Sequence, residues 1–176
     1  MTQGTTLIRT IQGDITKITT VVAIVNAANK SLLGGGGVDG AIHRAAGPDL
    51  LKECRTLNGC RTGEAKITKG YKLPAKYVIH TPGPVWHGGS KNEPQLLASC
   101  YRSCLTLAVE NGCKTVDFPS ISTGVYHFPL EKASVIAINT IADFLKQHPE
   151  IERVRMVCFD EKTKVHYDRA IAALEA

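Results

Sequence analysis

The chain has 176 residues, a net charge of +5, and the composition of an ordinary globular protein, with 43% hydrophobic and 21% charged residues. This length predicts a single domain over residues 1–176 with a sizeable core. The apolar runs are far too short to cross a bilayer, which excludes a membrane-spanning protein, and the absence of a dense Lys/Arg run argues against nucleic acid as a partner, although the positive charge suits an anionic ligand.

The first residues contain no basic segment followed by an apolar one, so the sequence shows no secretory signal and we expect a cytoplasmic protein. The six cysteines are consistent with a cytoplasmic protein, and none of them forms the C-x-x-C pair of zinc and redox sites. Cys100 and Cys104 lie one helical turn apart, in line with Leu97 and Leu107, which predicts apolar packing. Nothing in the sequence indicates a metal site or a cofactor.

Strand and helix patterns alternate along the chain. Residues 7–12 form the first predicted strand, the apolar residues 21–25 form the second, and helices follow at 38–46 and 48–57. The remaining predicted strands cover 64–69, 76–80, 115–118 and 153–159, and the remaining predicted helices cover 93–111, 130–147 and 162–174. Such alternation predicts an α/β fold with a largely parallel sheet that helices cover on both faces.

Three loops that follow predicted strands have compositions suited to ligand binding. Gly13-Asp14-Ile15-Thr16 follows the first strand, a glycine-rich segment at 26–40 follows the second, and Pro119–Tyr126, rich in small hydroxyl residues, follows the strand at 115–118. In parallel α/β sheets, ligands bind beyond the carboxyl ends of the strands. We therefore expect these loops to form one site.

The segment Gly34-Gly35-Gly36-Gly37 places a loop without Cβ atoms between a strand and a helix, an arrangement that holds phosphates through backbone N–H groups. Gly35-x-Gly37-x-x-Gly40 also matches the dinucleotide fingerprint, but several residues separate the strand from the glycines and no acidic residue ends the next strand. A P-loop would need Lys and Ser or Thr after the last glycine, where Val38-Asp39 stand. A flexible surface loop remains the simplest alternative.

Polar residues flank the glycines on both sides. An amide such as that of Asn29 can bind sugar hydroxyls, and a carboxylate that faces a phosphate loop, such as that of Asp39, can orient or deprotonate a water molecule. Asp39 alone could also be a simple helix N-terminal charge, worth under about 1 kcal/mol. Its position beside Asn29 and the glycines favours the catalytic interpretation.

These motifs together resemble those of the macrodomain family, and specifically its MacroD-type members. The matching segments occur in the family's order: Gly13–Thr16, Val25–Asn29, Gly34–His43, and Ile121–Tyr126. The resemblance covers nearly the whole chain and implies a three-layer α/β/α sandwich around a mixed, largely parallel sheet. It also implies binding of ADP-ribose and hydrolysis of its esters, namely mono-ADP-ribosylated Asp or Glu on proteins and O-acetyl-ADP-ribose, without a cofactor.

The resemblance implies a role for each matching residue. Asp39 would activate the attacking water, and Asn29 would hold the distal ribose, flanked by Tyr126. Asp14 would accept a hydrogen bond from the adenine, near Phe159. The implied substrate contacts, from the adenine to the distal ribose, are Asp14, Ile15, Asn26, Gly35, Gly36, Gly37, Val38, Ser122, Thr123, Gly124, Val125, Tyr126 and Phe159.

Other functions and residues remain open at this stage. A reader module that binds ADP-ribose without hydrolysing it is the main alternative, and an RNA-binding module lacks any supporting motif. We expect His43 to contact Asp39 structurally, His80 to be a buried histidine with satisfied hydrogen bonds, Trp86 to pack at the rim, and His127 to face solvent.

Overall fold

The structure is a computed structural model that describes residues 7–175. Its strands are β1 (Ile8–Gln12), β2 (Ala23–Ala28), β3 (Lys66–Lys69), β4 (Tyr77–Pro82), β5 (Thr115–Phe118) and β6 (Arg153–Cys158). Its helices are the short 3₁₀ turn η1 (Ile15–Lys17), α2 (Gly37–Ala46), α3 (Pro48–Arg55), α4 (Glu93–Glu110), α5 (Leu130–Gln147) and α6 (Glu161–Glu175). Each predicted helix and strand is therefore present, with ends shifted by at most three residues.

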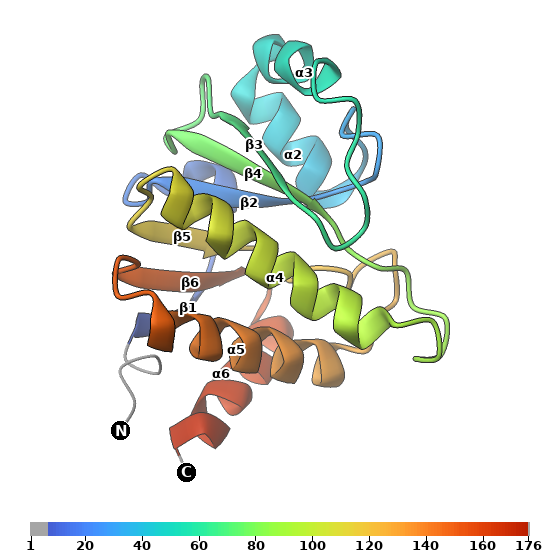
Figure 1. Cartoon of the computed structure of the whole chain (residues 1–176), viewed down its shortest axis with the longest axis vertical. Helices are drawn as coiled ribbons and strands as arrows, with labels where there is room; N and C mark the ends of the chain where they lie inside the picture. The colour runs from blue at the N-terminus through green and yellow to red at the C-terminus, as the bar shows by residue number, and fades with distance from the viewer. Residues whose placement is uncertain (1–6, 176) are drawn as a thin grey trace.

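The strands form one sheet in the order β1-β6-β5-β2-β4-β3 (Figure 1). All neighbouring strands are parallel except the edge strand β3, which runs antiparallel to β4. The prediction of a mixed, largely parallel sheet is confirmed. Because five strands run the same way, the loops that follow β1, β2, β4, β5 and β6 all leave the sheet at one edge.

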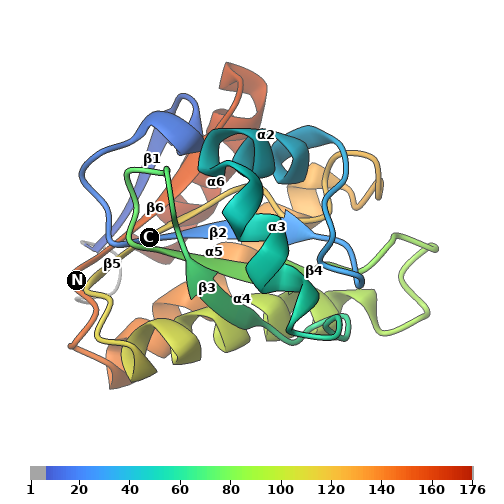
Figure 2. The same ribbon diagram turned by 90° about the horizontal axis from the view of Figure 1, so that it is seen from above.

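Helices cover both faces of the sheet, as the alternating sequence predicted. Apolar side chains of α2 and α3, such as Ile42 and Leu50, pack with Ile24 and Val78 on one face. Helices α4, α5 and α6 pack on the opposite face with residues such as Val25. Figure 2 shows α2 on one side of the sheet and α4 with α5 on the other. The result is a three-layer α/β/α sandwich.

Strand β2 differs most from its predicted range, since it ends at Ala28 rather than at residue 25. The extra residues pair with β4, where Asn26 lies opposite His80 and Ala27 opposite Thr81. Polar and small residues at the end of an apolar run look like a loop in the sequence, and only pairing with a neighbouring strand keeps them extended. Asn26 therefore lies within the sheet.

Other sequence expectations on packing are confirmed. All six cysteines are buried and free, and Trp86 packs against Phe128 with ring centroids 4.7 Å apart.

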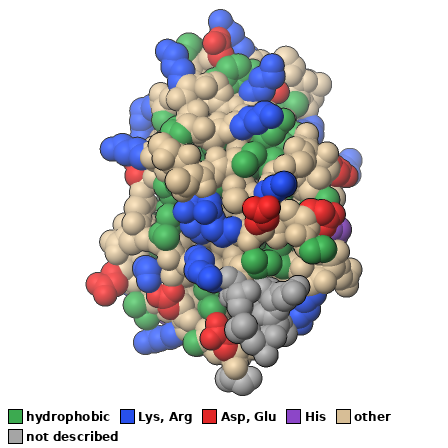
Figure 3. All heavy atoms as spheres, turned by 90° about the vertical axis from the view of Figure 1, so that its left-hand side faces the viewer, with side chains coloured by type: hydrophobic (Ala, Val, Ile, Leu, Met, Phe, Trp, Pro, Cys, Tyr) green, Lys and Arg blue, Asp and Glu red, His purple; other side chains and the backbone are tan. Residues whose placement is uncertain are grey.

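Within residues 7–175, no helix has the length and apolar character needed to span a membrane. On the face in Figure 3, basic side chains are spread among acidic and hydrophobic ones rather than gathered into one stripe.

A buried ion pair joins β5 and β6. The Arg155 guanidinium donates from Nε to Asp117 Oδ1 at 2.9 Å and from Nη2 to Oδ2 at 3.0 Å, and Asp117 is fully buried. We expect Arg155→Met to lower the free energy of unfolding by about 3–5 kcal/mol, because it leaves a buried carboxylate unpaired. Urea denaturation measures this change. Lys114→Met, which breaks an exposed pair with Glu152, should cost under about 1 kcal/mol, and similar losses for both variants would contradict the prediction.

Candidate active site

The predicted site residues lie at the edge of the sheet where the parallel strands end. Asp14 and Ile15 follow β1, Asn29 and the glycines follow β2, and Ser122–Tyr126 follow β5, while Phe159 follows β6. The strand order puts these loops in a row from β1 through β6 and β5 to β2. An elongated ligand could therefore contact all of them.

The glycine loop closes tightly over the first turn of α2. A Cβ at Gly40 would stand 2.5 Å from the Gly35 carbonyl oxygen, so only glycine allows this approach. Cβ atoms at Gly36 and Gly37 would meet nothing within 4 Å, so space is open in front of the loop. No side chain caps α2 at Gly36, which leaves backbone N–H groups of its first turn available to an anion.

Asp39 lies beneath this loop in the first turn of α2 and is only 4% exposed. Its Oδ1 accepts a hydrogen bond from Asn26 Nδ2 at 2.9 Å and lies 3.4 Å from His43 Nε2. Its Oδ2 lies 3.2 Å from the point where a Gly35 Cβ would stand, and Asn29 Nδ2 lies 3.4 Å from the same point. One carboxylate oxygen is thus fixed by protein, while the other faces the glycine loop beside Asn29.

Asn26, which the sequence analysis expected to contact the substrate, lies inside the sheet instead of at the surface of the site. It has no exposed surface, because it lies in β2 under α2. Its Nδ2 donates to Asp39 and lies 3.2 Å from His80 Nδ1. In the structure, Asn26 therefore holds the carboxylate of Asp39, and the interpretation of Asn26 as a substrate contact is replaced by a positioning role.

His80 continues this buried network. It is buried with both ring nitrogens in hydrogen bonds, as the sequence analysis expected. Burial, helped by nearby His43, lowers the pKa of His80 to about 3, so its ring is neutral at physiological pH. Its Nδ1 then accepts from Asn26, and its Nε2 donates to Thr68 Oγ1 at 3.0 Å. A chain of hydrogen bonds thus runs from Thr68 on β3 across β4 and β2 to Asp39 on α2.

Asn29 shapes the glycine loop. Its Nδ2 donates to the Gly34 carbonyl oxygen at 2.8 Å, and its Oδ1 accepts from Ser31 Oγ at 2.6 Å and from Leu32 N at 3.1 Å. These bonds fix the amide at the entrance to the glycine loop. A sugar hydroxyl would add to this set of bonds or replace one of them.

Asp14 lies at the other end of the row. Hydrogen bonds from the Thr16 hydroxyl at 2.6 Å and the Thr16 backbone N–H at 2.9 Å lower the pKa of the Asp14 carboxyl. Asp14 remains exposed while Ile15 is buried. An exposed, ionised acceptor at a fixed position suits a ligand that donates a hydrogen bond.

The loop after β5 faces the glycine loop from the neighbouring strand. Ser122 has a positive φ of 67°, and its Oγ is buried without a hydrogen-bond partner. Ser120 Oγ binds the Thr123 hydroxyl at 2.7 Å, and Gly124 accepts from the His127 backbone N–H at 3.0 Å. This strained, internally bonded loop is the kind of backbone that persists where it binds a ligand.

Two strongly exposed hydrophobic side chains lie on the middle loops of the row, those that follow β5 and β6. Val125 is 86% exposed and Phe159 is 79% exposed, the highest values among the exposed large hydrophobic residues of the described chain. Tyr126 lies beside Val125 and its backbone carbonyl accepts from the Trp86 N–H at 2.9 Å. His127 is exposed, as expected.

Sequence reasoning assigned no site residue to the segment after β4, where it expected only rim packing by Trp86. Gly83 packs so closely on the β5 loop that a Cβ there would stand 2.2 Å from Ser122 Oγ. Glu93 is buried at the start of α4 and accepts from the backbone N–H groups of His87, Gly89 and Lys91. The glycines at 88 and 89 were the only signal for this closed loop.

A comparison with protein families matches the macro domain model to residues 25–137. A macro domain-containing protein of Chlorobaculum tepidum is 62% identical over 95% of this chain and 96% of its own length. An O-acetyl-ADP-ribose deacetylase of Cronobacter sakazakii is 53% identical over 93% of both chains. The ADP-ribose glycohydrolase MACROD2 of Xenopus laevis is 57% identical over 91% of this chain, which spans 38% of that protein.

The solved structures agree with the sequence relatives. A Trypanosoma brucei macrodomain in complex with ADP-ribose superposes with a TM-score of 0.88 at 48% identity, over 94% of this chain and 69% of that one. The two chains therefore share a fold over nearly the whole length of this one.

Proposed function

The chain belongs to the macrodomain family, and from this premise we propose that it binds ADP-ribose and hydrolyses ADP-ribose esters. The proposed substrates are O-acetyl-ADP-ribose and mono-ADP-ribosylated Asp or Glu side chains of proteins. The names of the deacetylase and glycohydrolase relatives support hydrolysis, and the ADP-ribose complex of the Trypanosoma brucei macrodomain supports the ligand.

The row of loops matches the order of groups in ADP-ribose. The adenine would lie at Asp14 and Ile15 with Phe159 beside it. The diphosphate would lie between the backbone N–H groups of Gly35–Val38 and those of Ser122–Val125, where the N-terminus of α2 favours negative charge. The distal ribose would then reach Asn29 and Tyr126, next to Asp39.

The observation on which catalysis rests is the geometry of the Asp39 carboxylate. Asn26 fixes Oδ1 at 2.9 Å, and Oδ2 faces the glycine loop where the distal ribose would lie. A water molecule held by Oδ2 would lose its proton to the carboxylate as it attacks the ester carbonyl carbon. The bond from that carbon to the ribose oxygen then breaks, Asp39 returns the proton to the ribose oxygen, and ADP-ribose leaves together with a carboxylic acid, which releases its own proton to solvent. General base catalysis of this kind contributes about 10²- to 10⁴-fold.

Incubation with O-acetyl-ADP-ribose tests this proposal. We expect ADP-ribose and acetate to appear in equal amounts on chromatography, at a rate well above that of the uncatalysed reaction. A protein that binds ADP-ribose in calorimetry but leaves the ester intact would be a reader module, and the hydrolase proposal would fail.

We propose the cytoplasm as the place of action. Six buried thiols without disulfides fit a reducing compartment, where mono-ADP-ribosylated proteins would be its macromolecular partners.

A further inference from the structure

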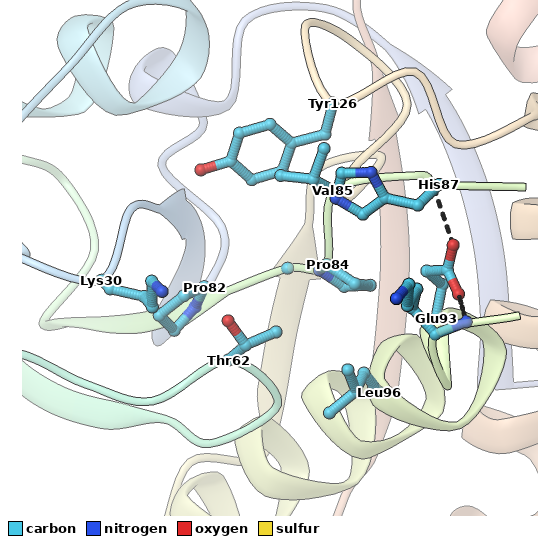
Figure 4. A pocket seen from close by; sticks show the side chains of 11 residues that line it. Lys30, Thr62, Pro82, Pro84, Val85, His87, Glu93, Leu96 and Tyr126 are labelled. Carbon is cyan, nitrogen blue, oxygen red and sulfur yellow. Dashed lines mark hydrogen bonds between the residues drawn. The ribbon is translucent and has the colours of Figure 1, made fainter. Parts of the chain in front are cut away.

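A pocket of about 250 Å³ opens at the carboxyl end of β4 (Figure 4). Pro84 and Leu96 contribute apolar surface, and Lys30, His87 and Lys91 contribute polar groups, while Tyr126 borders the pocket from the β5 loop. We call this the β4 pocket. Its volume corresponds to roughly eight water molecules at ~30 Å³ each, enough for an amino-acid side chain.

The β4 pocket continues the row of loops that forms the proposed ADP-ribose site. Strand β4 is the next strand after β2 in the sheet, so the pocket lies beyond the distal-ribose end, on the side away from the adenine. Lys30 directly follows Asn29, and its carbonyl oxygen accepts from Cys60 N at 2.9 Å, which fixes its backbone. The pocket is therefore on the side where the acyl group of an ester on the distal ribose would leave.

Glu93 is the one carboxylate that lines the β4 pocket among the described residues. It accepts from the backbone N–H groups of His87 at 2.7 Å, Gly89 at 3.0 Å and Lys91 at 2.6 Å (Figure 4 draws the bond from His87). Burial alone would raise the pKa of Glu93, but these hydrogen bonds lower it to about 2. Glu93 is therefore ionised and holds the loop that carries Lys91. The two exposed lysines, Lys30 and Lys91, outnumber this single negative charge at the pocket.

We propose that the β4 pocket binds the peptide that carries the ester, and that it favours peptides with further acidic side chains beside the modified residue. This inference rests on the proposed function. Hydrolysis releases the peptide as a side-chain carboxylate, and Lys30 and Lys91 would attract both that group and its acidic neighbours. The apolar floor would accommodate the methylene groups of the acyl chain.

Two peptides with the same mono-ADP-ribosylated Glu test the proposal, one with flanking Asp and Glu residues and one with Asn and Gln in their place. We expect wild-type protein to hydrolyse the acidic peptide with roughly fivefold higher kcat/KM at low ionic strength, mainly through KM, since each exposed charge pair contributes modestly. The preference should fade as salt screens the charges.

The double variant Lys30→Glu and Lys91→Glu should abolish or reverse this preference. A second variant with the same net charge, Lys114→Glu and Lys146→Glu, changes exposed lysines just before β5 and near the end of α5 and should keep it. Equal rates on both peptides, or a preference that survives the Lys30 and Lys91 changes, would overturn the inference while leaving the hydrolase proposal intact. Failure to hydrolyse even the neutral peptide would instead count against the proposed function.

Discussion

The Asn26→Asp variant should be strongly destabilised and should lose at least about tenfold in ester hydrolysis. Asn26 Nδ2 lies 2.9 Å from Asp39 Oδ1, and the two residues are 0% and 4% exposed. A second carboxylate in that position must stay protonated or repel Asp39, and both outcomes disturb the proposed catalytic base. Uncompensated buried charge typically costs about 3–5 kcal/mol, which urea denaturation would detect.

The pH dependence of this loss provides a sharper readout. A buried carboxyl whose pKa is raised binds a proton more readily in the folded state than in the unfolded state, so the variant should regain stability relative to wild type as the pH falls from 8 to 5. Asn139→Asp, the same change on the exposed face of α5, should show neither effect. An Asn26→Asp variant with wild-type stability and activity would rule out the positioning role of Asn26.

Replacement of Asp39 should separate binding from catalysis. We expect Asp39→Ala and Asp39→Asn to retain much of the ADP-ribose affinity but to lower ester hydrolysis by at least about tenfold, because both remove the base that activates the water. Asp39→Asn keeps an oxygen that can accept from Asn26, so its melting temperature should stay near that of wild type. Calorimetry and a chromatographic assay, run side by side on one ester, measure the two effects.

Asp49→Ala is the matched control for the role of Asp39 as a helix charge. Asp49 lies in the first turn of α3, as Asp39 lies in the first turn of α2, but its side chain is 61% exposed. Removing it should cost under about 1 kcal/mol of stability and leave hydrolysis unchanged. If Asp39→Ala resembles Asp49→Ala in both assays, Asp39 is only a helix N-terminal charge.

The elements of the fold were predictable because their signals are local. The apolar stripe of Ala133, Ala137 and Ile141 indicates α5 at its observed range, 130–147, and the alternation of elements indicates a parallel sheet. The glycine loop and Asp39 were also recognisable, since the residues proposed to hold the phosphates and the water are close together in the sequence. The ends of β2 and β4 were not, because their last residues stay extended only through pairing with each other.

The residues that support the site were harder to predict, because they meet only in the folded sheet. Asn26 and His80 are 54 positions apart and come into contact through the register of β2 and β4. The sequence around Asn26 and Asn29 does not show which of them supports Asp39 and which is free to contact a ligand. In the structure, Asn26 is fully buried, whereas Asn29 is partly exposed. The β4 pocket likewise depends on Gly83 packing against a loop nearly 40 positions later in the chain.

The most direct test of the proposed activity is a single-turnover assay with a peptide mono-ADP-ribosylated on glutamate, followed by mass spectrometry. We predict that the wild-type protein releases free ADP-ribose and regenerates the unmodified glutamate, and that Asp39→Ala binds the peptide but releases ADP-ribose at least about tenfold more slowly. A wild-type protein that binds the modified peptide and leaves its mass unchanged would contradict the proposed hydrolase activity.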